Sequence, residues 1–211
     1  MNAVIGAGMG AGRRPWVKIC GLTTPEAVAA ALDCGVDALG FVFHARSPRN
    51  LAPAQALVLA RDVPRSVLRV AVTLHPAQTL VDEIAEVFRL DLLQTDAADL
   101  ESLQLPPGLA ALPVVRCGTP PPADLPQRLL YEGSRSGAGD VADWHEARAL
   151  ARRTELVLAG GLDAGNVAAA IAAVRPFGVD VSSGVESAPG RKDPRRIREF
   201  VSAAQSACGA P

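Results

Sequence analysis

The stretch VDVSSGVESAPGRKD, residues 179–193, begins as a short strand in which valines alternate with polar residues. The strand ends in a turn of two serines and a glycine. Earlier in the chain, LAGGLDAGNV (158–167) has the same organisation: an apolar strand, a pair of glycines and then a helical pattern. A strand, a small-residue turn and a helix in this order are typical of a unit of a parallel sheet.

The same unit recurs along the chain, where short apolar strands alternate with Ala-rich helical patterns. Eight units over about 195 residues predict an α/β protein, a single (β/α)₈ TIM barrel of eight parallel strands covering residues 15–211. A doubly wound open sheet is the alternative. We expect strands at 16–20, 37–43, 68–73, 90–94, 113–116, 128–132, 155–159 and 178–182. We expect helices at 25–33, 53–62, 77–88, 143–152, 163–173 and 193–205, and weaker ones at 98–104 and 122–127.

Residues 1–14, MNAVIGAGMGAGRR, contain glycines at the spacing of a dinucleotide-binding loop. Such a loop needs a full strand before it and a helix after it, but here only four or five residues precede the glycines and Pro15 follows. We therefore interpret residues 1–14 as a flexible leader that binds no cofactor.

Composition excludes several classes of function. A net charge of −1 predicts no nucleic-acid surface, and the absence of a run of 18 apolar residues predicts no membrane span. The four cysteines are too far apart for a metal knuckle or a redox pair, so we expect no metal, and reduced thiols in the cytoplasm. They are Cys20, Cys34, Cys117 and Cys208.

Two charged residues are predicted to meet where the barrel closes. Side chains of a barrel strand alternate between the interior and the helix layer. The flanking valines and Ile19 suit the helix layer, so Lys18 of the first strand and Asp180 of the eighth point inward. A buried charge is tolerable only when paired. We therefore predict contact between Lys18 and Asp180.

The turns after strands seven and eight are predicted to bind a phosphate. Gly160 and Gly161 let the backbone approach an anion, and Ser182, Ser183 and Gly184 supply hydroxyl and amide donors. A short helix after the serines would add a favourable dipole. The loops after these two strands are where such barrels hold phosphate. Either turn alone would be ordinary, but the two together favour a site.

Other polar residues nearby are given structural interpretations. Asp163 is expected to be the N-cap of the helix after the glycine turn. Arg191 and Lys192 are expected to be solvated and to add only distant positive potential. The histidines are expected in loops or at the surface: His44, His75 and His145.

The segments KICGLT, GVDALGFVF followed by SPR, AGGL…NV, and GVDVSSGVE…GRKD together resemble phosphoribosylanthranilate isomerase of tryptophan biosynthesis, over residues 16–203. Their order and spacing are those of that family. The resemblance implies a (β/α)₈ barrel without metal or organic cofactor. It also implies a phosphorylated small-molecule substrate, N-(5-phosphoribosyl)anthranilate, which an Amadori rearrangement converts to 1-(2-carboxyphenylamino)-1-deoxyribulose 5-phosphate.

The resemblance implies that Cys20 of KICG is the catalytic base. Lys18 would lower the pKa of this thiol, and Asp180 would partly offset that effect. The family's acid is an aspartate at the end of strand six, where this chain has Glu132. Tyr131 is the competing alignment, and its phenol is a poor acid near neutral pH. Glu132 must carry a proton to act, which burial would favour.

The resemblance also implies which residues bind substrate. Arg49 of SPR corresponds to the arginine for the anthranilate carboxylate, with Arg46 a weaker candidate. Gln94 is kept from the family's QLHG, and Asp180 contacts the sugar or anthranilate. Lys18 is also expected among the substrate-binding residues. Phe43 either lines the ring's pocket or lies in the core.

One further position departs from the family: Asp96 stands where a histidine is usual. A second acid would make the pocket more negative and push Glu132 toward its neutral form.

Two other classes of function remain open. A related sugar-phosphate barrel would carry acids or lysines on the first strand in place of KICG. A non-catalytic binder of phosphorylated ligands is favoured only by the missing aspartate. The sequence predicts no oligomeric state.

Overall fold

Eight parallel strands close into a barrel, in which each strand pairs with the next along the chain and the last pairs with the first. The computed structural model describes residues 14–134 and 142–207. The pairing of the first and last strands confirms the predicted barrel and excludes the open sheet. The strands are β1 (Trp16–Cys20), β2 (Ala38–Val42), β3 (Leu68–Val72), β4 (Leu92–Asp96), β5 (Ala110–Arg116), β6 (Arg128–Glu132), β7 (Glu155–Leu158) and β8 (Gly178–Val181).

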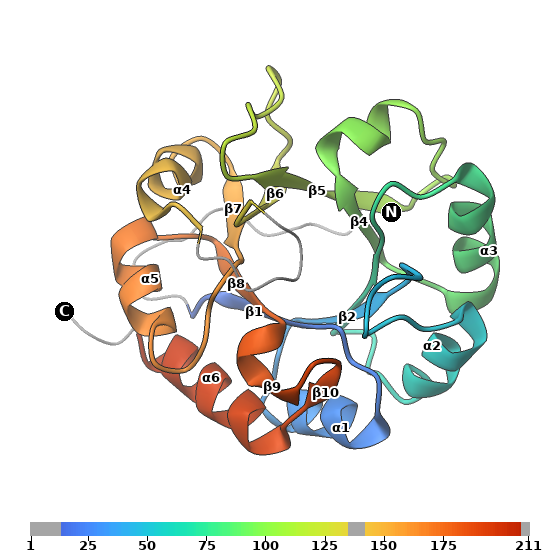
Figure 1. Cartoon of the computed structure of the whole chain (residues 1–211), viewed down its shortest axis with the longest axis horizontal. Helices are drawn as coiled ribbons and strands as arrows, with labels where there is room; N and C mark the ends of the chain where they lie inside the picture. The colour runs from blue at the N-terminus through green and yellow to red at the C-terminus, as the bar shows by residue number, and fades with distance from the viewer. Residues whose placement is uncertain (1–13, 135–141, 208–211) are drawn as a thin grey trace.

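Helices surround the ring of strands (Figure 1). The described residues form six α-helices: α1 (Pro25–Asp33), α2 (Pro53–Leu59), α3 (Gln78–Phe88), α4 (Trp144–Ala151), α5 (Val167–Val174) and α6 (Pro194–Ser206). After β8 come the 3₁₀ turn η2 (Ser183–Val185) and a small antiparallel hairpin of β9 (Glu186–Ala188) and β10 (Arg191–Lys192).

Two of the predicted helices are replaced by shorter connections. The 98–104 segment forms only the 3₁₀ turn η1 (Ala97–Glu101). The expected helix at 122–127 was wrong, because the segment between β5 and β6 contains no helix. Its run of prolines supplies no backbone N–H and keeps preceding residues out of the helical region.

Three of the helices begin with a side-chain cap, and the N-cap predicted for α5 was wrong. Thr24, Asp143 and Asp193 accept backbone N–H groups at the starts of α1, α4 and α6. Asp163 is not the N-cap of α5, which is Asn166. Instead, the Asp163 carboxylate accepts the N–H groups of residues 165 and 166 and closes the turn before the helix.

The two faces of the strands alternate as predicted. Val17, Ile19, Val179 and Val181 lie in the main core between strands and helices, whereas Lys18 and Asp180 do not. Interior residues such as Leu112, Val114 and Leu130 form a separate apolar layer.

The amino ends of the strands close the bottom of the barrel. There the Arg128 guanidinium lies 4.0 Å from the ring centroid of Phe177 and 5.6 Å from that of Trp16. It also binds Glu155 at 2.7 Å. In the part of the chain that the structure describes, these side chains therefore fill the amino end of the barrel.

Part of the sequence interpretation falls outside the described residues. Of the predicted leader only Arg14 is described, and it forms a two-pronged ion pair with Asp37 at 2.7 and 2.8 Å. Cys208 also lies outside the described residues. Among residues 14–134 and 142–207, no helix combines the length and apolarity needed to cross a bilayer.

Candidate active site

The carboxyl ends of the strands and the loops after them surround a pocket of about 480 Å³. Its size lies within the range of small-molecule sites, which are about 300–1,000 Å³. Of the predicted site residues, only Lys18 and Gly184 are outside its lining. The others line it: Cys20, Arg49, Gln94, Glu132, Gly160, Gly161, Asp180, Ser182 and Ser183.

Lys18 lies beneath the pocket and pairs with Asp180, as predicted. The two residues are register partners on β1 and β8, and Lys18 Nζ lies 2.8 Å from Asp180 Oδ1. Burial alone would lower the pKa of Lys18, but Asp180 and the Cys20 thiol raise it above its ordinary value. Gly40 of β2 makes room, since an added Cβ would lie 3.1 Å from the Cys20 sulfur and 3.2 Å from Lys18 Cε.

Cys20 ends β1 and is buried at the pocket wall. Burial raises the pKa of its thiol, and Asp180 adds to the rise, while Lys18 and Lys192 act in the opposite direction. The net pKa is raised. Lys18 does lower the pKa of the Cys20 thiol, as expected. The pKa is nevertheless raised overall, because the desolvation of the buried thiol is the larger effect.

Arg49, after β2, is held by a residue that the sequence interpretation did not assign. Its Nε and Nη2 atoms bind the two Glu186 oxygens at 2.6 and 2.8 Å. Both side chains are buried and both line the pocket. Glu186 occupies one edge of the guanidinium, so only the Nη1–Nη2 edge remains for a ligand carboxylate. The sequence did contain a pointer to Glu186, because this residue ends the segment GVDVSSGVE that was quoted for the resemblance.

Arg191 is exposed, as expected, but the expectation that Lys192 is solvated was wrong, because its side chain is buried. Lys192 is buried because the β9–β10 hairpin folds it back against η2. Its Nζ binds Glu186 at 2.7 Å and the Ser182 carbonyl at 2.9 Å. Burial lowers the pKa of Lys192, and Glu186 only partly offsets this. A buried cation therefore sits directly behind the serine turn.

The two small-residue turns border the pocket together. Gly160 and Gly161 adopt φ values of 87° and 64°, a backbone conformation that favours glycine. Ser182 Oγ donates to the Cys20 carbonyl at 3.1 Å, which ties the eighth strand's turn to the end of β1. Gly184 packs against the Leu162 carbonyl, and any side chain there would clash with it.

Glu132 and Tyr131 lie on opposite faces of β6. The Tyr131 hydroxyl donates to Glu146 of α4 at 2.5 Å, and its ring is fully buried in the outer core. Burial and Glu146 raise the pKa of Tyr131, which removes it as an acid. Glu132 lines the pocket and lies 3.1 Å from Arg116, at the end of β5. No sequence argument singled out Arg116, although it ends an apolar strand.

Gln94 and several loop residues complete the wall. Gln94 is buried, and among the described residues its Oε1 atom has no hydrogen-bond partner, as expected of a ligand contact. Phe43 belongs to the core, packed on Phe88 with ring centroids 5.5 Å apart. His44 and Arg46 line the pocket from the loop after β2, and the sequence interpretation assigned no role to His44.

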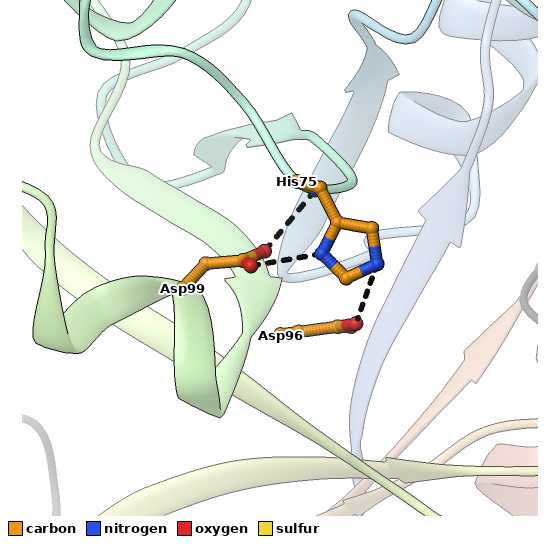
Figure 2. Close-up of side chains that lie close together, drawn as sticks. All are labelled: His75, Asp96 and Asp99. Atoms are coloured by element: carbon orange, nitrogen blue, oxygen red, sulfur yellow. Dashed lines mark hydrogen bonds and ion pairs between the residues drawn. The ribbon is translucent and has the colours of Figure 1, made fainter.

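One cluster has metal-ligand chemistry, beside the pocket. His75, Asp96 and Asp99 bring one ligand atom each to within 4.8 Å of one another (Figure 2). Both Asp96 oxygens, however, lie 2.7 Å from Arg116 nitrogens, and His75 Nδ1 lies 2.9 Å from Asp99. These ion pairs already use the carboxylates, so the cluster is better described as a charge network.

Comparisons with known proteins agree with this geometry. A family model described as N-(5'-phosphoribosyl)anthranilate (PRA) isomerase matches residues 17–203. A relative of that name from Bradyrhizobium sp. strain BTAi1 is 39% identical over 209 residues, 90% of this chain and 95% of the relative. One from Trichlorobacter lovleyi is 40% identical over 201 residues, 90% of this chain and 98% of the relative.

Solved structures show the same relationship. Phosphoribosyl anthranilate isomerase from Thermotoga maritima superposes with a TM-score of 0.79 at 29% identity, covering 91% of this chain and 99% of that one. A structure of such an isomerase in complex with reduced 1-(o-carboxyphenylamino)-1-deoxyribulose 5-phosphate gives a TM-score of 0.72 with the same identity and coverage.

Proposed function

The chain belongs to the N-(5'-phosphoribosyl)anthranilate isomerase family, and we propose that Cys20 and Glu132 are the base and the acid of its reaction. The chain is an isomerase of tryptophan biosynthesis, which converts N-(5-phosphoribosyl)anthranilate to 1-(2-carboxyphenylamino)-1-deoxyribulose 5-phosphate. The observation that supports the residue assignment is that thiol, carboxyl, arginine and both small-residue turns line one pocket.

Ring opening is the first step. Glu132 donates a proton to the ribose ring oxygen while the aniline nitrogen lone pair expels it, which gives an iminium. Cys20 then removes the proton from C2, and the C2 electrons neutralise the iminium to form an enol-amine that tautomerises to the ketone. The iminium is its own electron sink. Its positive charge also favours the thiolate, which opposes the effect of burial on the Cys20 pKa.

Substrate is held at its two charged ends. The free edge of the Arg49 guanidinium takes the anthranilate carboxylate. The turn of Gly160 and Gly161 and the turn of Ser182, Ser183 and Gly184 take the phosphate. Buried Lys192, bonded to the Ser182 carbonyl, supplies positive potential behind the second turn.

Between these ends, the sugar is oriented by two side chains. The unpartnered Oε1 of Gln94 accepts a sugar hydroxyl, and Asp180 reaches the sugar or the anthranilate nitrogen. Lys18 supports this contact by holding the Asp180 carboxylate at 2.8 Å.

We also propose that the protein works in the cytoplasm on a small phosphorylated substrate. Cys20, Cys34 and Cys117, the cysteines among the described residues, are all free thiols, which suits a reducing compartment.

The assay of loss of phosphoribosylanthranilate fluorescence tests the assignment. Cys20→Ala and Glu132→Gln should each lower kcat by about 10²–10⁴-fold, the usual contribution of acid–base groups. Cys34→Ala at the C-cap of α1 and Glu83→Gln on α3 are matched controls outside the pocket and should keep the wild-type rate. A wild-type rate in Glu132→Gln would remove Glu132 from the mechanism. A wild-type protein without turnover would support the non-catalytic binder instead.

A further inference from the structure

Behind Glu132 lies a charge network that the proposed chemistry does not use. Arg116, at the end of β5, stands between acids from the strands on either side. Its guanidinium binds Asp96 of β4 at 2.7 Å and Glu132 of β6 at 3.1 Å. Glu132 lines the pocket, but Arg116 and Asp96 are not part of its lining. Glu132 is the lining residue that this network contacts, through Arg116.

The network continues outward to the surface. His75, in the loop after β3, lies with its Nε2 atom 3.7 Å from Asp96, while its Nδ1 atom and backbone N–H contact Asp99 at 2.9 and 3.1 Å (Figure 2). Thr95 donates a further hydrogen bond to Asp99 at 2.7 Å. His75 is thus the outer partner of Asp96, and Arg116 is the inner one.

A bound divalent cation explains this arrangement less well. A metal at His75, Asp96 and Asp99 would sit next to the Arg116 cation and would compete with it for an Asp96 oxygen, because both of these oxygens lie 2.7 Å from Arg116 nitrogens. It would also need a His75 nitrogen that now faces a carboxylate. The contacts present instead satisfy each charge with an opposite one.

We propose that Arg116 and Asp96 are positioning residues that set the protonation of the general acid Glu132. Arg116 holds the Glu132 carboxyl and favours its ionised form. Asp96 shares the same guanidinium, weakens that effect and so favours the proton-carrying form that catalysis needs. The inference rests on the proposed function, since it concerns Glu132 only as the proton donor.

Among residues 14–134 and 142–207, the other titratable groups that share the pocket with Glu132 come from several elements. Beyond Arg116 and Cys117 on the β5 side, the pocket brings Cys20 from β1, Asp180 from β8, Glu186 from β9, and His44, Arg46 and Arg49 from the loop after β2. The adjoining end of β7 contributes Ala159, which does not titrate. Changing Arg116 or Asp96 leaves all of these in place, so a shift can be assigned to the network.

The pH profile of kcat/KM tests this directly. A carboxyl ordinarily has a lower pKa (about 4.3) than a thiol (about 8.5), and burial raises the pKa of Cys20 further, so we assign the low-pH limb to Glu132. Asp96→Asn should move this limb to lower pH and lower the plateau. Arg116→Gln should move it to higher pH, by about one unit for the loss of a neighbouring cation. Arg116→Lys keeps the charge and should restore the limb to near its wild-type position.

The matched control is the Arg69–Asp91 pair, bonded at 2.9 Å at the amino ends of β3 and β4, opposite the pocket. Arg69→Gln and Asp91→Asn should leave the limb in place. If Asp96→Asn and Arg116→Gln only lower the rate with an unmoved limb, the inference is wrong, while the slow Glu132→Gln variant still supports the function. If Arg116→Gln does not fold, Asp96→Asn alone decides. An inactive wild-type protein would overturn both.

Discussion

The charges on the two sides of the pocket differ in their access to water. On the side of the base, Lys18–Asp180 and Arg49–Glu186 are closed pairs, and their side chains are 0–9% exposed. On the side of the acid, Asp96, Arg116 and Glu132 are 13–17% exposed, and the chain of contacts ends at His75, which is 69% exposed. Cys20, the proposed base, therefore lies beside buried charges that water does not reach, and Glu132, the proposed acid, lies beside charges that water can compensate.

This difference has energetic consequences. Removing one member of a dry pair leaves a buried charge without compensation, whereas water replaces a lost partner at the surface. The dry side should determine stability and substrate geometry, and the wetter side should adjust protonation.

The largest effect is expected from Lys18→Met, which leaves Asp180 alone in the barrel. The free energy of unfolding should fall by about 3–5 kcal/mol, as for other broken buried pairs, measured by urea unfolding. The double variant Lys18→Met/Asp180→Leu should recover part of this loss. Arg69→Met, which breaks a half-exposed pair, is the control. If Lys18→Met and Arg69→Met lowered the free energy of unfolding equally, the contrast between buried and solvent-exposed ion pairs would be wrong.

Glu186→Gln should weaken substrate binding. The Glu186 carboxylate binds one edge of the Arg49 guanidinium and so orients the other edge toward the substrate, and the variant loses this orientation. A hydrogen bond to a charged group contributes about 1.5–3 kcal/mol, so KM should rise by about 10–100-fold with a smaller change in kcat. Steady-state kinetics measures the split. Glu155→Gln, which loosens Arg128 at the closed end of the barrel, should leave KM unchanged. A drop in kcat alone would argue against Arg49 as the carboxylate site.

The same residue predicts how stability depends on pH. Burial alone would raise the pKa of Glu186, but Arg49 and Lys192 lower it below its ordinary value. A lowered folded-state pKa stabilises the protein above the unfolded-state value of about 4.3, and this stability is lost as pH falls through the folded-state pKa. Glu186→Gln should therefore be less stable than wild type at pH 7, with the gap narrowing near pH 3. Urea unfolding at both values checks this, and a gap that is constant with pH would contradict it.

His75→Gln should have the smallest effect. Asp99 raises the pKa of His75, and the pKa of Asp99 is lowered in spite of its partial burial. A raised histidine pKa stabilises the fold below about pH 6.5, and the contribution is lost as pH rises through the folded-state value. Because the pair is exposed, we expect a loss below about 1 kcal/mol at pH 5.5 and none at pH 9. A larger loss at pH 9 would show that His75 acts by packing.

The strands and most helices could be predicted from the sequence because hydrophobic period and turn residues are local signals. The alternation of side chains along each strand also predicted that Lys18 and Asp180 point inward on neighbouring strands, since this alternation depends only on position along a strand. The expectation of a helix at 122–127 failed because prolines outweighed a weak pattern. The N-cap of α5 was misplaced because Asp163 closes a turn of its own before the helix begins.

The sequence by itself determined the barrel, the two small-residue turns and the family, and the resemblance to the family led to the proposal of Cys20 and Glu132 as base and acid. Only the tertiary structure decided the ionic partners: Glu186 between Arg49 and Lys192, and Arg116 between Asp96 and Glu132. These ion pairs join residues from different strands and loops. The sequence gives the sign of each charge, but it does not show which oppositely charged residue the fold brings next to it. The net pKa of Cys20 was likewise decided by burial, which depends on everything packed around the thiol.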